Sequence, residues 1–260
     1  MTRLLSGVVL GAAALGAILF LPPAVLLGLA CAVAALAAHE YLGVLHHGER
    51  APASFPILLL VVLTCWMMAA PEGAELLGLL LLGFGWLAAE VLFRGVTVER
   101  AAARVLAQWY IGMPLGMLAA VGALGGRTAV LLLIATVVVS DSAQLYTGRL
   151  FGRRPLAPTI SPKKTIEGAA GGAVIATLFM AAVGPVWLPS AGRLPLALLG
   201  VAIVALGICG DLFESRLKRV AGVKDSAAVI PGHGGVLDRI DALLFATPAF
   251  YLYVRFAGGG

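Results

Sequence analysis

Long apolar runs, each close to the length that crosses a bilayer, dominate this sequence. Hydrophobic residues make up 61% of the 260 residues, and charged residues only 12%. About 20 apolar residues in a helix cross the hydrocarbon core, and only helices or closed barrels satisfy their backbone groups there. The sequence therefore predicts an all-α fold, a polytopic bundle of transmembrane helices, rather than an ordinary soluble domain.

Nine of these runs are candidate spans. They cover residues 4–21, 24–45, 55–70, 74–93, 105–121, 128–141, 168–188, 194–213 and 240–257. We interpret the first as a span and not as a signal peptide, because no small-residue cleavage site with a polar start follows it. We expect one integral membrane unit, with N-terminal helices in residues 1–123 and C-terminal helices carrying the polar motifs in residues 124–260.

The positions of Lys and Arg predict the orientation of these spans. Cytoplasmic connections of membrane proteins are enriched in both residues. With a cytoplasmic N-terminus, nine spans place all but three of the 18 Lys and Arg residues on the inner side. The exceptions are Arg127, Arg193 and Arg255. Omission of one span would scramble this distribution, and the same model places the C-terminus outside.

Four aspartates lie at the predicted inner ends of spans, namely Asp141, Asp211, Asp238 and Asp241. Asp238 and Asp241 are three residues apart, so they point the same way from the first turn of the last span. Carboxylate oxygens suit Mg²⁺, which takes one or two of them and leaves positions for water and substrate phosphate. The alternative is that these acids form interfacial salt bridges with neighbouring arginines.

A polar stripe marks the end of the eighth predicted span. Asp211, Glu214, Ser215 and Lys218 recur at helical spacing and therefore share one face. Candidate phosphate-binding groups begin at the end of this stripe and continue to residue 235. They are Lys218, Arg219, Lys224 and the turn Pro231-Gly232-His233-Gly234-Gly235. Amides around glycines ahead of a helix form an anion-binding concavity, although the same turn could be only a flexible connection.

Residues 141–168 form a second polar segment, which we expect to be a long ordered cytoplasmic loop. Its candidate phosphate ligands are Arg149, Lys163 and Lys164, with Ser161 and Thr165 as further hydrogen-bond donors. The alternative is an ordinary positively charged loop that touches anionic lipid. We favour that alternative for Arg153 and Arg154.

These two segments carry a specific resemblance. The run SRLKRVAGVKDSAAVIPGHGGVLDRID, residues 215–241, resembles the signature of the phosphatidate cytidylyltransferases, also called CDP-diacylglycerol synthases. DSAQLYTGRLFG, residues 141–152, and ISPKKTIEG, residues 160–168, resemble a second block of that family. One departure is the pair Gln144 and Leu145, where the family often has Ala-Tyr. The resemblance covers about the last half of the chain; the first half matches only in hydrophobicity and length.

The resemblance implies that CTP and phosphatidate react to give CDP-diacylglycerol and pyrophosphate. It further implies dependence on Mg²⁺, with a second cation left open, and a homodimer in a bacterial plasma membrane with its active site on the cytoplasmic side. No nucleic-acid partner is expected. Soluble CTP and a lipid phosphate can meet only where inner loops join span ends, which is where the carboxylates are predicted.

The site assignments follow from the same resemblance. Asp211 and Asp238 are the expected primary metal ligands, with Asp241, Glu214 and Asp141 as secondary ones. The expected catalytic residues are Asp211, Asp238, Lys218, Arg219 and Asp241. The expected substrate-binding residues are Ser161, Lys163, Lys164, Thr165, Arg149, Ser215, Lys224, His233, Gly234, Gly235 and Arg239.

Two other functions remain open. Another CTP-using membrane enzyme, such as a polyprenol kinase or a CDP-archaeol synthase, would share the topology and a related nucleotide site. A transporter of anionic solutes would instead show charge at the midplane and internal repeats, neither of which the sequence has. His46 and His47 beside Glu49 could bind a metal, but we interpret them as part of a solvated loop.

Overall fold

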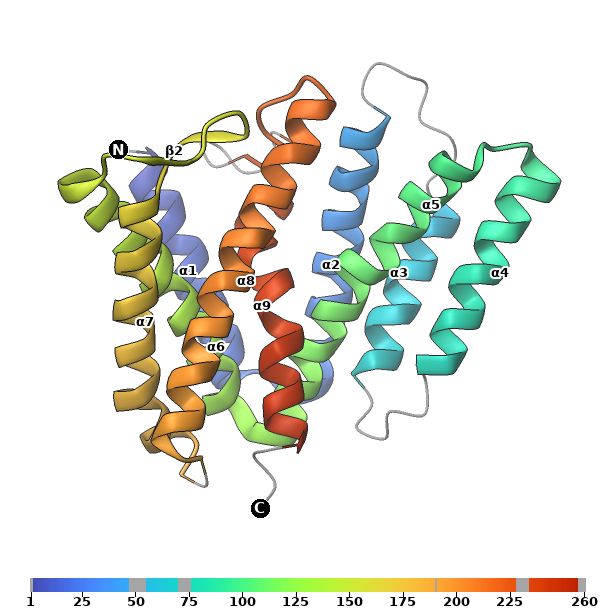
Figure 1. Cartoon of the computed structure of the whole chain (residues 1–260). Helices are drawn as coiled ribbons and strands as arrows, with labels where there is room; N and C mark the ends of the chain where they lie inside the picture. Colours follow the sequence, from blue (N-terminus) through green and yellow to red (C-terminus); the bar gives the residue numbers. More distant parts are fainter. Residues whose placement is uncertain (1, 47–54, 70–75, 190, 228–233, 257–260) are drawn as a thin grey trace. The chain divides into compact units, whose positions relative to one another are not determined.

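The computed structural model describes residues 2–46, 55–69, 76–189, 191–227 and 234–256, and helices dominate it (Figure 1). The helices are α1 (Thr2–Phe20), α2 (Pro23–Leu45), α3 (Phe55–Met68), α4 (Leu76–Arg94), α5 (Val98–Ala107), η1 (Gln108–Gly112), α6 (Met113–Phe151), α7 (Ile166–Trp187), α8 (Arg193–Val220) and α9 (Leu237–Phe256). The two strands are β1 (Pro155–Ala157) and β2 (Ser161–Thr165).

Five helical stretches among the described residues are long and apolar enough to cross a membrane. They are Pro23–Leu45, Leu77–Arg94, Val98–Phe151, Ile166–Trp187 and Arg193–Val220. Gly11–Phe20 and Phe55–Met68 are apolar but shorter. The protein is therefore membrane-embedded and essentially helical, whereas the count of nine spans stays a prediction. The described helix α9 is not among these five stretches, and it carries four charged residues, Asp238, Arg239, Asp241 and Arg255.

Helices extend into both of the predicted polar segments. α6 continues ten residues beyond Asp141 to Phe151, and α8 continues beyond the predicted end at 213 to Val220. Polar residues do not end a helix, whereas glycine and proline do. α6 ends only where Gly152 and Pro155 follow. The expectation of a loop over residues 141–168 was thus wrong for its first eleven residues.

Most of the remaining segment is a small antiparallel hairpin, which the sequence did not predict, and the all-α class holds for the fold as a whole. β1 pairs with β2 through Pro155 opposite Thr165 and Ala157 opposite Ser161. Both strands contact α7. The proline-rich sequence suits a short edge ribbon, because proline cannot donate to a central ladder.

A kink in α6 divides the predicted spans 105–121 and 128–141. Gly126 has φ 74° and ψ −178°, a conformation that glycine adopts readily because it has no Cβ. Before the kink, α5, the π-helical turn η1 and the first part of α6 follow one another without a break.

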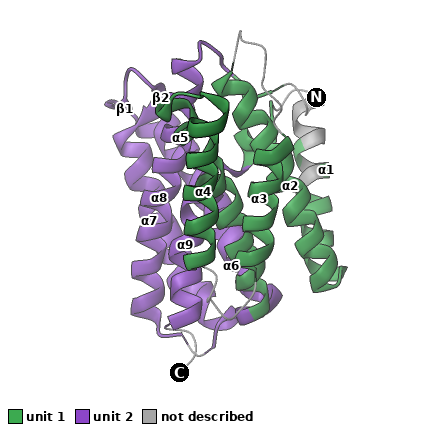
Figure 2. Cartoon of the chain, turned by 90° about the vertical axis from the view of Figure 1, so that its right-hand side faces the viewer, with its two compact units in different colours: residues 1–123, 225–239 green, residues 124–224, 240–260 purple. Residues whose placement is uncertain are grey.

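The chain forms two compact units, shown in green and purple in Figure 2. Unit 1 contains residues 1–123 and 225–239, and unit 2 contains residues 124–224 and 240–260. In unit 1, α3 packs against α2 and η1. A Cβ at Gly112 would lie 2.6 Å from the carbonyl oxygen of Val61, and one at Gly116 would collide with that of Cys65. The small residues spaced four apart therefore let two helices of the same unit approach closely.

Unit 1 also contains a buried ion network. Glu90, 1% exposed, accepts from Arg94 Nη1 at 2.8 Å and from Arg104 Nη1. Arg104 is itself buried, and its Nε donates to His46 Nε2 at 3.3 Å. The interpretation of His46 as a solvated residue was therefore wrong, because its side chain is buried and accepts a hydrogen bond from Arg104. His47 and Glu49 lie outside the described residues.

In unit 2, α7 packs along α8, and α8 also packs against α9. The contact with α9 is closest at Gly210, where a Cβ would collide with the carbonyl oxygen of Asp241 and lie 3.2 Å from Cβ of Phe245. One turn earlier, a Cβ at Gly207 would lie 3.6 Å from Cβ of Ala242, an ordinary contact.

We expect Gly210→Ala to destabilise the protein by about 1–3 kcal/mol, because the added methyl group forces α8 and α9 apart. Thermal unfolding in detergent measures the change. Gly207→Ala is the matched control, and it should be neutral or stabilising, since alanine favours a helix by about 1 kcal/mol over glycine. Equal stability of the two variants would contradict this account of the contact.

Candidate active site

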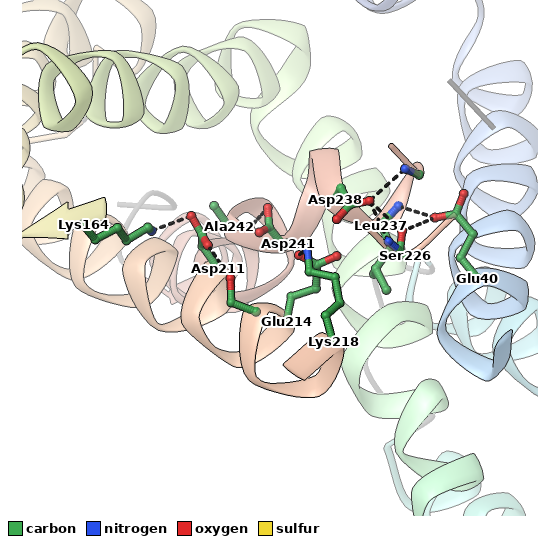
Figure 3. A network of polar contacts seen from close by, with 12 residues as sticks. Glu40, Lys164, Asp211, Glu214, Lys218, Ser226, Leu237, Asp238, Asp241 and Ala242 are labelled. Carbon is green, nitrogen blue, oxygen red and sulfur yellow. Dashed lines mark hydrogen bonds and ion pairs between the residues drawn. The ribbon is translucent and has the colours of Figure 1, made fainter. Parts of the chain in front are cut away.

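The polar face of α8 forms one side of a charged cluster in unit 2. Ser215 Oγ donates to Asp211 Oδ1 at 3.3 Å, and Lys218 Nζ donates to Glu214 Oε2 at 2.7 Å. The predicted helical stripe is thereby confirmed. Glu214 is only 2% exposed, so its charge requires the nearby ammonium group. Figure 3 shows Asp211, Glu214 and Lys218 along α8.

Two further carboxylates of unit 2 join this face. Asp241, from α9, is close enough to Asp211 and Asp141 for their negative charges to repel one another. Lysines offset the repulsion, because Lys164 interacts with Asp141 and Lys218 with Asp241. The Lys164 Nζ lies 2.5 Å from Asp211 Oδ2. Three helices and the hairpin thus bring three carboxylates and two lysines together.

The hairpin that carries Lys164 is fixed by hydrogen bonds within unit 2. Glu167 Oε2 accepts from the backbone N–H groups of Arg153 and Arg154 at 3.0 and 3.2 Å. Thr165 Oγ1 accepts from Gly168 N–H at 3.1 Å and caps α7. Thr165, predicted as a substrate ligand, therefore has a structural contact that the sequence analysis did not foresee.

Asp238 is organised by a separate set of contacts in unit 1. Its Oδ2 accepts from Ser226 N–H at 3.0 Å, Ser226 Oγ at 2.8 Å and Gly235 N–H at 2.8 Å. Gly234 has φ 78°, and a Cβ there would lie 2.7 Å from the same oxygen. The Asp238 carboxylate therefore holds Ser226 and Gly235 against the first turn of α9. His233 lies outside the described residues.

Glu40 of α2 completes this set, and sequence reasoning missed it. The side chain is 4% exposed; Oε1 accepts from Val236 N–H at 2.9 Å, and Oε2 accepts from Leu237 N–H at 2.8 Å. Ser226 Oγ also lies 3.1 Å from Oε2. An ionisable residue inside an apolar run is a functional candidate by default, so the lone acidic residue of α2 was the available signal.

The cluster in unit 2 fits a divalent cation by its chemistry. Three mutually repelling carboxylates offer the hard oxygen ligands that Mg²⁺ prefers. Within the described ranges, no three Asp, Glu, His or Cys side chains form a ready-made metal cluster. Mg²⁺ sites commonly use one or two carboxylates with substrate phosphate and water, so the donor set matches such a site better than a closed structural one.

Comparison with known proteins identifies the family of this chain. The model of the cytidylyltransferase family matches residues 1–257. The chain belongs to the cytidylyltransferase family. The resemblance seen in the polar segments is thus confirmed, and the match extends over the first half of the chain, where the sequence motifs gave no indication.

Curated relatives of this cytidylyltransferase-family chain include the "Uncharacterized protein YnbB" of Escherichia coli, 42% identical over 132 residues, which are 51% of this chain and 44% of the relative. The "Phosphatidate cytidylyltransferase" of Aquifex aeolicus is 43% identical over 122 residues, 47% of this chain and 45% of the relative. The protein of that name in Bacillus subtilis is 40% identical over 153 residues, 56% and 55% respectively. The matched regions span about half the length of these relatives.

The other predicted site residues of this cytidylyltransferase-family chain are mostly exposed. Lys163 precedes Lys164 on β2, where successive side chains point to opposite faces, and it is exposed whereas Lys164 is half-buried. Ser161 is half-buried at the start of the same strand. Four further basic residues are exposed, namely Arg149 in α6, Arg219 in α8, Lys224 after α8 and Arg239 in α9.

Proposed function

We propose that this protein transfers the cytidylyl group of CTP to phosphatidate, giving CDP-diacylglycerol and pyrophosphate in phospholipid biosynthesis. The observation that carries the proposal is the cluster of Asp141, Asp211 and Asp241 with Lys164 and Lys218. Such a set can bind phosphates and a divalent cation together. Family membership and relatives named phosphatidate cytidylyltransferase support the choice of nucleotide and lipid.

In the proposed reaction, a phosphatidate oxygen attacks the α-phosphorus of CTP. A new bond forms between that oxygen and phosphorus, and the bond to the oxygen that bridges the α- and β-phosphates breaks. The electron pair leaves with pyrophosphate. The nucleophile is already anionic at neutral pH, so the protein need not supply a strong general base. The principal barrier is repulsion between two polyanions, which positioning and positive charge reduce.

The lysines of unit 2 supply this positive charge. Lys164 would exchange its contact with Asp211 for a phosphate oxygen when substrate binds. Glu214 is better assigned to holding Lys218 than to binding metal, because its Oε2 already accepts from that ammonium group. Exposed Arg149, Lys163, Arg219, Lys224 and Arg239 are proposed to bind phosphate more peripherally. Ser161, Ser215, Thr165 and the His233-Gly234-Gly235 turn remain proposed substrate contacts.

Mg²⁺ is the proposed cofactor. When bound, it would neutralise charge on the phosphates and polarise their P–O bonds, so that electron density is drawn away from the phosphorus. Asp211 and Asp238 remain the proposed primary ligands, by similarity to the family, with Asp241 and Asp141 as secondary ones. The contacts of Asp238 with Ser226 and Gly235 would hold its carboxylate in one orientation. A second cation is a further possibility within this proposal.

We further propose that the protein is a homodimer in a bacterial plasma membrane, with its N-terminus and active site on the cytoplasmic side. The distribution of Lys and Arg supports this orientation. Cytoplasmic CTP would then reach carboxylates at the same depth as the phosphate of a membrane lipid.

The proposal is tested with purified protein in mixed micelles containing labelled CTP and Mg²⁺. We expect CDP-lipid and pyrophosphate in equal amounts, and only when phosphatidate is present. Turnover with a polyprenol or an archaeal lipid, but not with phosphatidate, would contradict the proposed acceptor. Solute uptake into vesicles without pyrophosphate release would favour a transporter instead.

Lys164→Ala should lower kcat/KM by about 100-fold, because it removes a positive charge from the place where phosphate charge develops. Steady-state kinetics at saturating Mg²⁺ measure the loss. Lys163→Ala is the matched control: the side chain is exposed, and we expect a change of about threefold or less. Equal losses in both variants would show that general loop charge, and not the contact with Asp211, explains the role of these lysines.

A further inference from the structure

Glu40 connects α2 to the signature segment across a separation of nearly 200 residues. All of its described hydrogen-bond partners belong to one short stretch of unit 1, residues 226–237. Figure 3 shows its carboxylate facing Ser226 and the start of α9. α2 contributes none of the motif residues identified from sequence, so this carboxylate has no part yet in the proposed reaction.

The contacts satisfy backbone groups that α9 cannot satisfy itself. The first N–H groups of a helix have no partner within the helix, and the helix dipole favours negative charge there. Glu40 supplies both an acceptor and a charge, through Oε1 to Val236 N–H and Oε2 to Leu237 N–H. Because the acceptor comes from a different helix, the contact fixes where α9 begins relative to α2 within unit 1.

The glycine at position 235 leaves room for the Glu40 carboxylate. A Cβ at Gly235 would collide with both Ser226 Oγ and Glu40 Oε2. Any other residue would therefore displace the glutamate or the serine. The absence of a side chain at this position and the burial of Glu40 are separate observations, and both indicate a specifically built contact.

Ser226 links Glu40 to Asp238. Its hydroxyl oxygen lies 3.1 Å from Glu40 Oε2 and 2.8 Å from Asp238 Oδ2, and its N–H also donates to Asp238. A hydroxyl has one proton, so Ser226 Oγ donates to one of these two carboxylates at a time or shares the proton between them. Glu40 holds Ser226 from one side and the backbone next to Asp238 from the other.

We propose that Glu40 is a positioning residue that fixes the orientation of the Asp238 carboxylate through Ser226 and the first turn of α9. This inference rests on the proposed function, in which Asp238 is a metal ligand. A glutamine at position 40 has only one acceptor oxygen. Its N–H₂ group would therefore face a backbone N–H donor, either that of Val236 or that of Leu237, and that hydrogen bond would be lost. The first turn of α9 would loosen, and Asp238 would bind the metal less well while remaining chemically intact.

Glu40→Gln is the test, and Glu99→Gln, an exposed carboxylate in α5, is the matched control. Hydrogen exchange of the metal-free protein reports the contact directly. In Glu40→Gln we expect exchange at Val236 and Leu237 to be about tenfold faster than in wild type. We also expect the Mg²⁺ concentration for half-maximal turnover to rise by about tenfold. Loss of a residue that orients a metal ligand commonly weakens metal binding by at least that factor. Glu99→Gln should match wild type in both measurements.

Wild-type exchange and wild-type Mg²⁺ dependence in Glu40→Gln would overturn the inference. Faster exchange with unchanged Mg²⁺ dependence would also overturn it, because Glu40 would then be only a structural cap. If wild type itself shows no cytidylyl transfer, the proposed function fails, while the exchange measurement still decides whether Glu40 holds α9.

Ser226→Ala provides a second test in case Glu40→Gln does not fold. It removes the shared hydroxyl and keeps the backbone contact to Asp238. We expect the Mg²⁺ concentration for half-maximal turnover to rise by several-fold, with thermal stability close to wild type. An unchanged Mg²⁺ requirement would contradict the link between Glu40 and Asp238.

Discussion

Asp211→Asn should lower kcat by about 10³-fold, equivalent to about 4 kcal/mol of transition-state stabilisation. Asparagine keeps the size of the side chain and one oxygen, but it removes the charge that the proposed cation requires. The ion pair with Lys164 would be lost as well, so that the hairpin lysine would no longer be held beside α8. Initial rates across a range of Mg²⁺ concentrations measure the effect.

Folding must be checked in the same preparation. Because Asp211 is part-exposed and its neighbour Asp241 repels it, we expect Asp211→Asn to unfold at a temperature equal to or above that of wild type. Glu99→Gln serves here too as a control for the loss of one negative charge. Turnover within tenfold of wild type in Asp211→Asn would contradict the metal assignment.

Arg104→Ala should destabilise the protein by about 3 kcal/mol, the second large effect that we expect. Arg104 is 7% exposed and pairs with Glu90, which is 1% exposed. Removal of one partner from a buried ion pair leaves the other charge insufficiently compensated, and such changes cost about 3–5 kcal/mol. His46 would lose its contact with Arg104 Nε in the same variant. Thermal unfolding in detergent measures the loss.

Arg94→Ala is the matched control for this network. Arg94 contacts the other oxygen of Glu90, but its side chain is 49% exposed and its guanidinium also stacks on Trp86. We expect a loss of about 1 kcal/mol or less, as for exposed ion pairs. A loss at Arg94 as large as that at Arg104 would show that burial is not what makes this network important.

Much of the helical architecture could be predicted because membrane burial requires long apolar runs. The observed α2, α7 and α8 begin within two residues of the predicted spans. The C-terminal ends were less predictable, since hydropathy falls at the membrane surface while helical hydrogen bonding continues. α6 and α8 therefore extend through polar residues to Phe151 and Val220.

The α8 cluster was predictable because helical spacing alone aligns its members. Asp211, Ser215, Glu214 and Lys218 form the expected i, i+4 contacts. The ion pair of Lys164 with Asp211 was not predictable, because it depends on a hairpin that hydropathy cannot indicate. Spacing along the chain thus predicted contacts within one helix and not those between a strand and a helix.

Glu40 and His46 illustrate the limit of motif reasoning. Both lie at one end of an apolar helix, and their neighbours in sequence do not indicate the contacts that the structure shows. Their partners are distant in the chain, at residues 226–237 for Glu40 and at Arg104 for His46. Burial creates the need for such partners, but only the folded chain shows which residues provide them.

The position of the transferred phosphate tests the central claim most directly. CTP labelled separately at the α- and γ-phosphates is incubated with the protein, phosphatidate and Mg²⁺, and the lipid and aqueous fractions are counted. Cytidylyl transfer predicts that the α-label enters the lipid and that the γ-label leaves as pyrophosphate. Entry of the γ-label into the lipid, with CDP as the other product, would show that the protein is a CTP-dependent kinase and would contradict the account.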